Sequence, residues 1–159
     1  MQNLFENNGA EFSACGKYRY ALWRIWDTNK PLLMFIGLNP STANADTDDP
    51  TIGSVKRITT HAGYGGFYMM NLFAFITESP DVLMKAADPL GENDGWLERI
   101  VVKCERVVFA WGAFKIAKER CKEVIERYPD AYCLGKNKDQ SPKHPLFQLG
   151  TTQIVKYNA

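Results

Sequence analysis

LLMFIGLNPSTANADTDDP, residues Leu32 to Pro50, is the stretch from which the fold can be read. It begins with an unbroken apolar run through Ile36 and stops at Asn39, which a proline follows. A run that is apolar on both faces and bounded by turn residues is typical of a central parallel strand covered by helices on each side. Ligands bind at the carboxyl ends of such strands, so Asn39 is a candidate functional residue. An ordinary Asn-Pro turn explains the same residues equally well.

Length and composition fit one domain. The chain has 159 residues and a formal net charge of +1. This charge excludes a strongly basic nucleic-acid coat but leaves room for a local cationic groove. The four cysteines form no C-x-x-C pair, so we expect no metal, no cofactor, and reduced thiols in a cytoplasmic protein. No secretory signal or membrane span is visible, so we expect no membrane partner and, by default, a monomer.

Apolar periodicity predicts strands and helices that alternate along most of the chain. The expected strands span residues 18–26, 32–38, 67–75, 107–112 and 131–134. The expected helices span residues 49–63, 80–87, 94–101 and 114–128, the first opened by Asp49 as N-cap and the third by Asp94. The simplest construction joins the first two strands as a hairpin, and residues 152–157 form either an edge strand or an ordered tail.

This order of elements predicts an α/β fold over a single domain, residues 1–159. We expect a three-layer sandwich: a mostly parallel four-stranded central sheet, helices on both faces, and an additional N-terminal antiparallel strand. Residues 1–16 carry little pattern and are expected to be a loosely attached arm.

Polar or aromatic side chains lie at or beyond the ends of several predicted strands, or, for Asn71, inside the second strand near its end. They are Asn39, Asn71, Trp111 with its glycine, and His144. Since the ends of parallel strands share one edge, we expect these residues to converge. An amide can orient a water or read a base, and an imidazole can donate to developing negative charge. Each also has a plainer interpretation, because strand ends, cores and loops use the same residues.

Charged residues near these strand ends offer a second kind of site. Asp48 and Asp49 invite a metal interpretation, but helix capping explains Asp49 and loop chemistry explains Asp48. Lys143, beside His144, could steer a phosphate or simply belong to a solvated basic loop. We expect capping rather than metal binding.

Five stretches together resemble one family. They are YRYALWRIW, FIGLNPSTANADTDDPTIGSVKRI, GYGGFYMMNLFAF, FAWG and CLGKNKDQSPKHPLF, and they are similar to the domain-of-unknown-function family 1643. These motifs are in turn similar, more distantly, to the uracil-DNA glycosylase superfamily. GLNPS stands where its mismatch-specific branch has Gly-hydrophobic-Asn-Pro-Gly, and Lys143-His144-Pro145 resembles the His-Pro opening of its DNA-intercalating motif.

The glycosylase resemblance implies roles for individual residues. Asn39 would position the attacking water, Asn71 would read a flipped base, and His144 would stabilise the leaving base or a phosphate. Asn39 and His144 are therefore the implied catalytic residues. The remaining implied substrate-binding residues are Gly37, Leu38, Pro40, Ser41, Trp111 and Lys143, and Asp48 and Asp49 form a possible acidic site.

The expected function is hydrolysis of an N-glycosidic bond in DNA or a nucleotide, with a modified or damaged base as a possible target. Nucleic acid or a nucleotide is thus the expected partner. One alternative is a nucleic-acid or nucleotide-binding module that keeps the pocket without the chemistry. Another is a phosphate-ester or nucleotide hydrolase that uses Asp48 and Asp49 with a divalent metal. The Ser-Pro-Leu wedge of the glycosylases is replaced by Leu146-Phe147, which leaves the form of the nucleic acid open.

Overall fold

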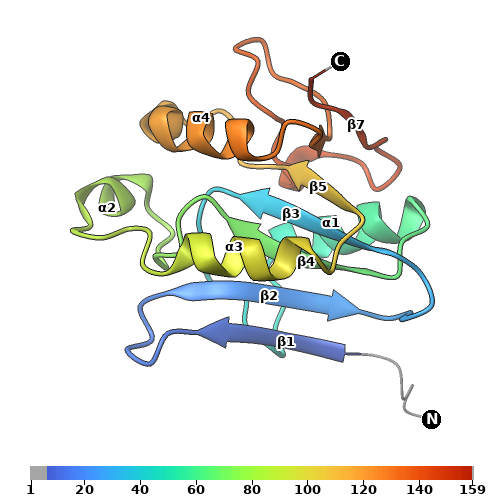
Figure 1. Cartoon of the computed structure of the whole chain (residues 1–159), viewed down its shortest axis with the longest axis horizontal. Coiled ribbons are helices and arrows are strands. Elements are labelled where there is room, and N and C mark those ends of the chain that lie inside the picture. Colours follow the sequence, from blue (N-terminus) through green and yellow to red (C-terminus); the bar gives the residue numbers. More distant parts are fainter. Residues whose placement is uncertain (1–6, 159) are drawn as a thin grey trace.

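The structure, a computed structural model that describes residues 7–158, is an α/β fold built on one seven-stranded mixed sheet (Figure 1). The order across the sheet is β1-β2-β4-β3-β5-β6-β7. The strands are β1 (Asn7–Phe12), β2 (Arg19–Ile25), β3 (Leu32–Gly37), β4 (Gly66–Asn71), β5 (Arg106–Phe109), β6 (Tyr132–Cys133) and β7 (Val155–Lys156). The helices are α1 (Pro50–His61), α2 (Pro80–Lys85), α3 (Asn93–Val101) and α4 (Lys118–Arg127), with short 3-10 turns η1 (Lys115–Ala117) and η2 (Pro145–Phe147).

Strand β3 is the middle strand, as the sequence predicts. It pairs in parallel with β4 on one side and with β5 on the other, and β5 pairs in parallel with β6. Strands β1, β2 and β7 run antiparallel to their neighbours at the two sides of this parallel centre. A strand with neighbours on both edges and apolar layers on both faces must be apolar throughout, and Leu33 to Ile36 are fully buried.

Side chains of β3 alternate between two apolar cores, one on each face of the sheet. Leu33 and Phe35 belong to the core that includes Ile52, Val55 and Ile58 of α1. On the other face, Met34 and Ile36 belong to the core that includes Leu97 and Ile100 of α3 and Val124 of α4. Figure 1 accordingly shows α1 behind the sheet and α3 in front of it. The predicted α/β class with helices on both faces is what the chain forms.

The predicted hairpin between residues 18–26 and 32–38 is wrong, because β4 lies between β2 and β3. The Gly65 carbonyl accepts hydrogen bonds from the N–H groups of Trp26 and Asp27, and the Gly65 N–H donates to the Pro31 carbonyl. A Cβ on Gly65 would lie 2.0 Å from the Asp27 carbonyl oxygen. Only a glycine lets the chain pass this close, so the glycines before β4 admit it between the two strands.

Two further expectations need correction. Within the predicted arm over residues 1–16, Asn7 to Phe12 form the edge strand β1, which pairs with β2 and shifts its register between Glu11 and Phe12; residues 1–6 lie outside the described part. Asp94 does not cap α3, whose N-cap is Glu92. The Asp94 carboxylate instead accepts from the guanidinium groups of Arg120 and Arg127, both in α4. These ion pairs between helices engage the side chain that was expected to cap α3.

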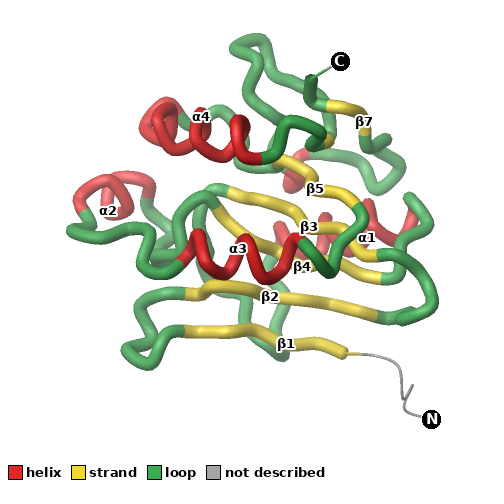
Figure 2. Tube along the Cα trace, in the orientation of Figure 1, coloured by secondary structure: helices red, strands yellow, loops and turns green. Residues whose placement is uncertain are grey.

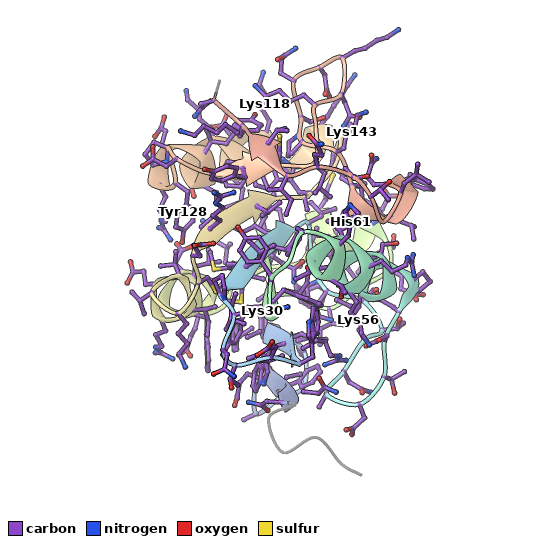
Figure 3. All side chains as sticks on the ribbon, turned by 90° about the vertical axis from the view of Figure 1, so that its right-hand side faces the viewer. Lys30, Lys56, His61, Lys118, Tyr128 and Lys143 are labelled. Atoms are coloured by element: carbon purple, nitrogen blue, oxygen red, sulfur yellow. The ribbon has the colours of Figure 1, made fainter. Side chains whose placement is uncertain are left out.

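Loops carry most of the chain after α4 (Figure 2), and they bring His144 back toward the sheet. The side chains drawn in Figure 3 place Lys143 in this C-terminal region and Lys56 on α1. Asp49 is the N-cap of α1, with its Oδ1 accepting from the Ile52 N–H at 2.9 Å, and Pro50 opens the helix. This helix start is therefore confirmed.

Replacing Ile36 by aspartate tests the central position of β3. Ile36 is 0% exposed, so Ile36→Asp would bury an unpaired carboxylate and should cost several kcal/mol, enough to unfold a domain of ordinary stability. Val102→Asp is the control: Val102 is 81% exposed, and its replacement should cost less than about 1 kcal/mol. Urea denaturation followed by circular dichroism measures both, and a cooperatively folding Ile36→Asp protein would contradict the central placement.

Candidate functional site

A polar cavity of about 320 Å³ lies at the carboxyl ends of β3 and β4. Residues predicted from the sequence to form the site line it together, although they are spread over more than 100 positions of the chain. They are Gly37, Leu38, Asn39, Pro40, Ser41, Asp49, Asn71 and His144. The convergence follows from the parallel pairing of β3 with β4, which aligns Gly37 with Asn71.

Asn39 is held in one orientation by backbone carbonyls. Its Nδ2 donates to the carbonyl oxygens of Pro40 (3.1 Å), Phe75 (3.2 Å) and Thr77 (2.8 Å). All three partners are acceptors, so the nitrogen and oxygen of the amide cannot be exchanged without losing every bond. The Oδ1 has no donor within residues 7–158 and is left as a free acceptor on a side chain that lines the cavity.

Asn71 is a buried amide without a protein partner. The residue is 3% exposed, and within the described part of the chain its side chain makes no hydrogen bond. Its backbone carbonyl is held by the Asn93 Nδ2 at 2.8 Å. Beside it, a Cβ on Gly37 would lie 2.9 Å from the Asn71 Oδ1, so glycine at this position leaves space for the amide. A buried amide with unused donors and acceptors suits recognition of a ligand.

His144 is positioned by the end of β5. The Gly112 N–H donates to the Pro142 carbonyl, and a Cβ on Gly112 would lie 3.3 Å from the His144 Cβ. The Nδ1 of His144 accepts from the Leu146 N–H at 3.1 Å. In the neutral ring the proton is then on Nε2, which becomes a donor.

The charge state of His144 is set by burial and by one acid. Burial lowers the pKa of the imidazole below its usual value, and the negative charge of Asp49 partly offsets that effect. The ring is therefore neutral at pH 7 and donates through Nε2 without carrying a charge.

The two adjacent acids serve different purposes. Asp49 lines the cavity while its two oxygens accept from the Ile52 N–H and, at 3.3 Å, from the Ser41 hydroxyl. Asp48 does not line it. The Asp48 carboxylate accepts from the Arg24 Nε at 2.9 Å and the Lys56 Nζ at 3.1 Å, and these bonds lower its pKa against the opposing effect of burial.

Two predicted substrate-binding residues lie elsewhere. Trp111 is 2% exposed and packs in the core, with its ring centroid 4.6 Å from that of Phe109, so it does not line the cavity. Lys143 lines a neighbouring cavity with Phe147, not the one that holds Asn39. The predicted contact with substrate therefore needs correction for Trp111, whose side chain the pleat of the chain turns into the core.

Arg19 is a cavity residue that sequence reasoning missed. It is 3% exposed at the start of β2, and its Nη1 donates to the Ala43 carbonyl at 3.1 Å. The signal was available, since Arg19 and Arg24 interrupt an otherwise apolar and aromatic strand. A cation in a strand buried on both faces requires a buried partner or a ligand.

Within residues 7–158, no group of three or more His, Cys, Asp or Glu side chains is arranged to hold a metal ion. None of the helices in that range combines the length and apolar character that a membrane crossing requires.

The fold and the cavity define an α/β protein with a polar pocket at the carboxyl edge of its sheet, lined by the cation Arg19 and the acids Asp49 and Glu78. The chain belongs to the family described as "Protein of unknown function (DUF1643)", which it matches over residues 19–146. No curated protein and no solved structure matches it. The expected family is thus confirmed, and the distant likeness to glycosylases stays a prediction.

The coupling of His144 to Asp49 can be measured directly. In an NMR titration of the imidazole protons, the pKa of His144 should lie below 6.5, its value when unperturbed. Asp49→Asn should lower it further, because the carboxylate is the group that raises it, while asparagine can still cap α1. Asp48→Asn is the matched control and should leave His144 unchanged. An equal shift in the two variants would show that Asp49 does not face the ring.

Proposed function

We propose that this protein hydrolyses the N-glycosidic bond of a nucleotide, free or within a nucleic-acid strand. The observation that carries the proposal is the grouping of three differently equipped side chains around one cavity: the free acceptor of Asn39, the unpartnered amide of Asn71 and the neutral donor of His144. Each supplies one of the three interactions that such a hydrolysis needs.

The first interaction is with water. The Asn39 Oδ1 accepts a hydrogen bond from a water molecule and fixes the direction of its lone pair. An amide does not take a proton at neutral pH, so its contribution is orientation rather than general-base catalysis. Three carbonyls hold the amide, so the water is positioned by a rigid element.

The second interaction is with the base. A base held against Asn71 can exchange hydrogen bonds with both ends of the amide, and glycine at position 37 leaves room for the amide itself at the cavity wall. Since the amide is buried, a base that leaves it without a hydrogen bond binds less tightly, by the desolvation free energy of a polar group, about 1–3 kcal/mol. That cost gives discrimination between bases.

The third interaction is with the charge that forms as the bond breaks. The C1′–N bond cleaves, its electron pair passes to the base, and the water oxygen bonds to C1′. The His144 Nε2–H donates to the departing base, and the water proton finally neutralises it. The Asp49 carboxylate, which also lines the cavity, stabilises positive charge on the sugar.

The alternatives account for fewer of these features. A metal-dependent hydrolase would need Asp48 as a ligand, but its oxygens bind Arg24 and Lys56 outside the cavity. A binding module explains Asn71 but leaves the fixed acceptor of Asn39 without a purpose. The likeness of GLNPS and Lys143-His144-Pro145 to glycosylase motifs supports the enzyme.

The test is a screen for base release. The purified protein is incubated with nucleotides and short strands that carry modified or damaged bases, and free bases are detected by mass spectrometry. A base released by the wild-type protein and not by Asn39→Ala supports the proposal. Release that persists in Asn39→Ala but stops in Asp48→Asn would assign the chemistry to the acidic segment.

Once a responsive substrate is known, replacing each of the three side chains should affect turnover and binding differently. Asn39→Ala should abolish turnover and weaken binding less than Asn71→Ala does, whereas Asn71→Ala should weaken binding and reduce discrimination between bases. His144→Ala should slow turnover by about 10²–10³ with a smaller effect on binding. Single-turnover rates and equilibrium binding separate these outcomes.

Matched controls are available for two of the variants. Asn29→Ala changes an exposed asparagine in the turn before β3, and His61→Ala changes the exposed histidine at the end of α1. Neither residue lines the cavity, so both variants should keep wild-type rates. A His61→Ala variant as slow as His144→Ala would remove the assigned role of His144.

A further inference from the structure

Arg19 is a buried cation whose hydrogen-bonding capacity is largely unused. Only 3% of the residue is exposed, and its Nη1 donates to the Ala43 carbonyl. The Nε is buried and has no partner. The Nη2 likewise makes no hydrogen bond within residues 7–158, and the side chain lines the cavity. Two donors of the guanidinium are therefore unused: the Nη2, on a side chain that lines the cavity, and the adjacent Nε, which is closed off from solvent.

The other two buried arginines are satisfied differently. Arg24 pairs with Asp48 and donates to carbonyls through both of its terminal nitrogens. Arg120 pairs with Asp94 and Glu123 and donates to the Leu72 carbonyl. Within the described residues, no ion pair involves Arg19. Arg19 is therefore the one of these three buried arginines without an ion pair, and a buried charge without a paired anion is costly.

Within the described residues, the acids of the cavity form no ion pair with Arg19, although the charge of Asp49 acts on it. Asp49 raises the pKa of Arg19 by its charge, but burial has the larger effect and lowers that pKa to about 10, so the group remains a cation at pH 7. The Asp49 oxygens are engaged by Ser41 and by the first turn of α1. Glu78 also lines the cavity but is exposed to water, which screens its charge.

Arg19 is accompanied by the first turn of α1. Thr51, the second residue of this twelve-residue helix, lines the same cavity. Within the described residues, neither its N–H nor its hydroxyl has a hydrogen-bond partner. Free N–H groups at a helix N-terminus favour negatively charged ligands, and phosphate in particular.

We propose that Arg19, aided by the N-terminal turn of α1, binds a phosphate group of the ligand that occupies the cavity. The planar fork of an arginine matches two phosphate oxygens, and the phosphate supplies the anion that the buried cation lacks. This inference rests on the proposed function, from which it takes its ligand class, and it adds which residue binds the phosphate of the nucleotide or nucleic-acid strand.

The test uses a ligand without a base, so that it does not depend on catalysis. Binding of 2-deoxyribose 5-phosphate and of 2-deoxyribose to the wild-type protein is measured by isothermal titration calorimetry. Charge-assisted hydrogen bonds predict that the phosphate increases affinity by about 10- to 100-fold. Equal affinities for the two sugars, or no gain from the phosphate, would overturn the inference.

Variants assign the gain to Arg19. Arg19→Gln should abolish the preference for the sugar phosphate, and Arg19→Lys, which keeps the charge but loses the fork, should keep part of it. Lys56→Gln removes the same charge from a side chain of α1 outside the cavity and should change nothing. A phosphate preference that survives in Arg19→Gln would overturn the inference.

A measurement on the wild-type protein covers the case in which the Arg19 variants fail to fold. In ¹⁵N-edited NMR spectra, the Nε–H resonance of Arg19 should shift on addition of 2-deoxyribose 5-phosphate and stay in place with 2-deoxyribose. The resonance of Arg24, which is already paired, should not move. A sugar phosphate that leaves the Arg19 resonance unchanged would contradict the assignment.

Two further ligands separate the sources of the phosphate. Thymidine 5′-monophosphate and a short single strand of thymidines are compared with thymidine, again with Arg19→Gln. Arg19-dependent binding of either ligand supports the inference, and the stronger one identifies a monoester or a diester as the source. Arg19-dependent binding of the phosphate without any base release would refute the proposed function alone, whereas base release together with phosphate binding that Arg19→Gln leaves unchanged would refute only this inference.

Discussion

The cavity depends on three hydrogen bonds from one nitrogen. The Nδ2 of Asn39 joins the end of β3 to the segment after β4 through the carbonyls of Phe75 and Thr77. The segment that follows β4, which forms no strand at these residues, is thereby fixed to the end of the middle strand of the sheet. The same bonds decide which end of the amide is free. One residue therefore shapes the cavity wall and supplies the acceptor that the proposed chemistry uses.

Two arginines of β2 hold the loop between β3 and α1, which forms another wall of the cavity. Arg24 and Arg19 extend from β2 and donate to carbonyls of the loop between β3 and α1, which carries the acidic residues. In Arg24 every nitrogen of the guanidinium is used, and Asp48 balances its charge. Arg19 uses one nitrogen and faces the cavity. Two arginines on one strand thus differ in their partners: Arg24 forms an ion pair with Asp48, whereas Arg19 forms none within the described residues and is the proposed phosphate ligand.

Local patterns in the sequence predicted the parts of the fold that local physics controls. The apolar run of β3 and the cap at Asp49 were predicted correctly, and the shared edge of parallel strands predicted that Asn39, Asn71 and His144 would meet. The pairing of β2 with β4 could not be predicted, because it depends on contacts between segments far apart in the sequence, such as the hydrogen bonds of Gly65 to the turn after β2. The same is true of Arg19, whose importance depends on which carboxylates other segments bring near it.

The central claim is that backbone carbonyls fix the Asn39 amide through its nitrogen and leave its oxygen as a free acceptor. The free energy of unfolding of Asn39→Asp at pH 7, measured against that of Asn39→Ala, tests this claim most directly. A carboxylate facing three carbonyls has no donor to bind, so Asn39→Asp should be less stable than Asn39→Ala by about 1–3 kcal/mol, and acidification that protonates it should reduce the difference. An Asn39→Asp protein as stable as the wild type at pH 7 would contradict the account.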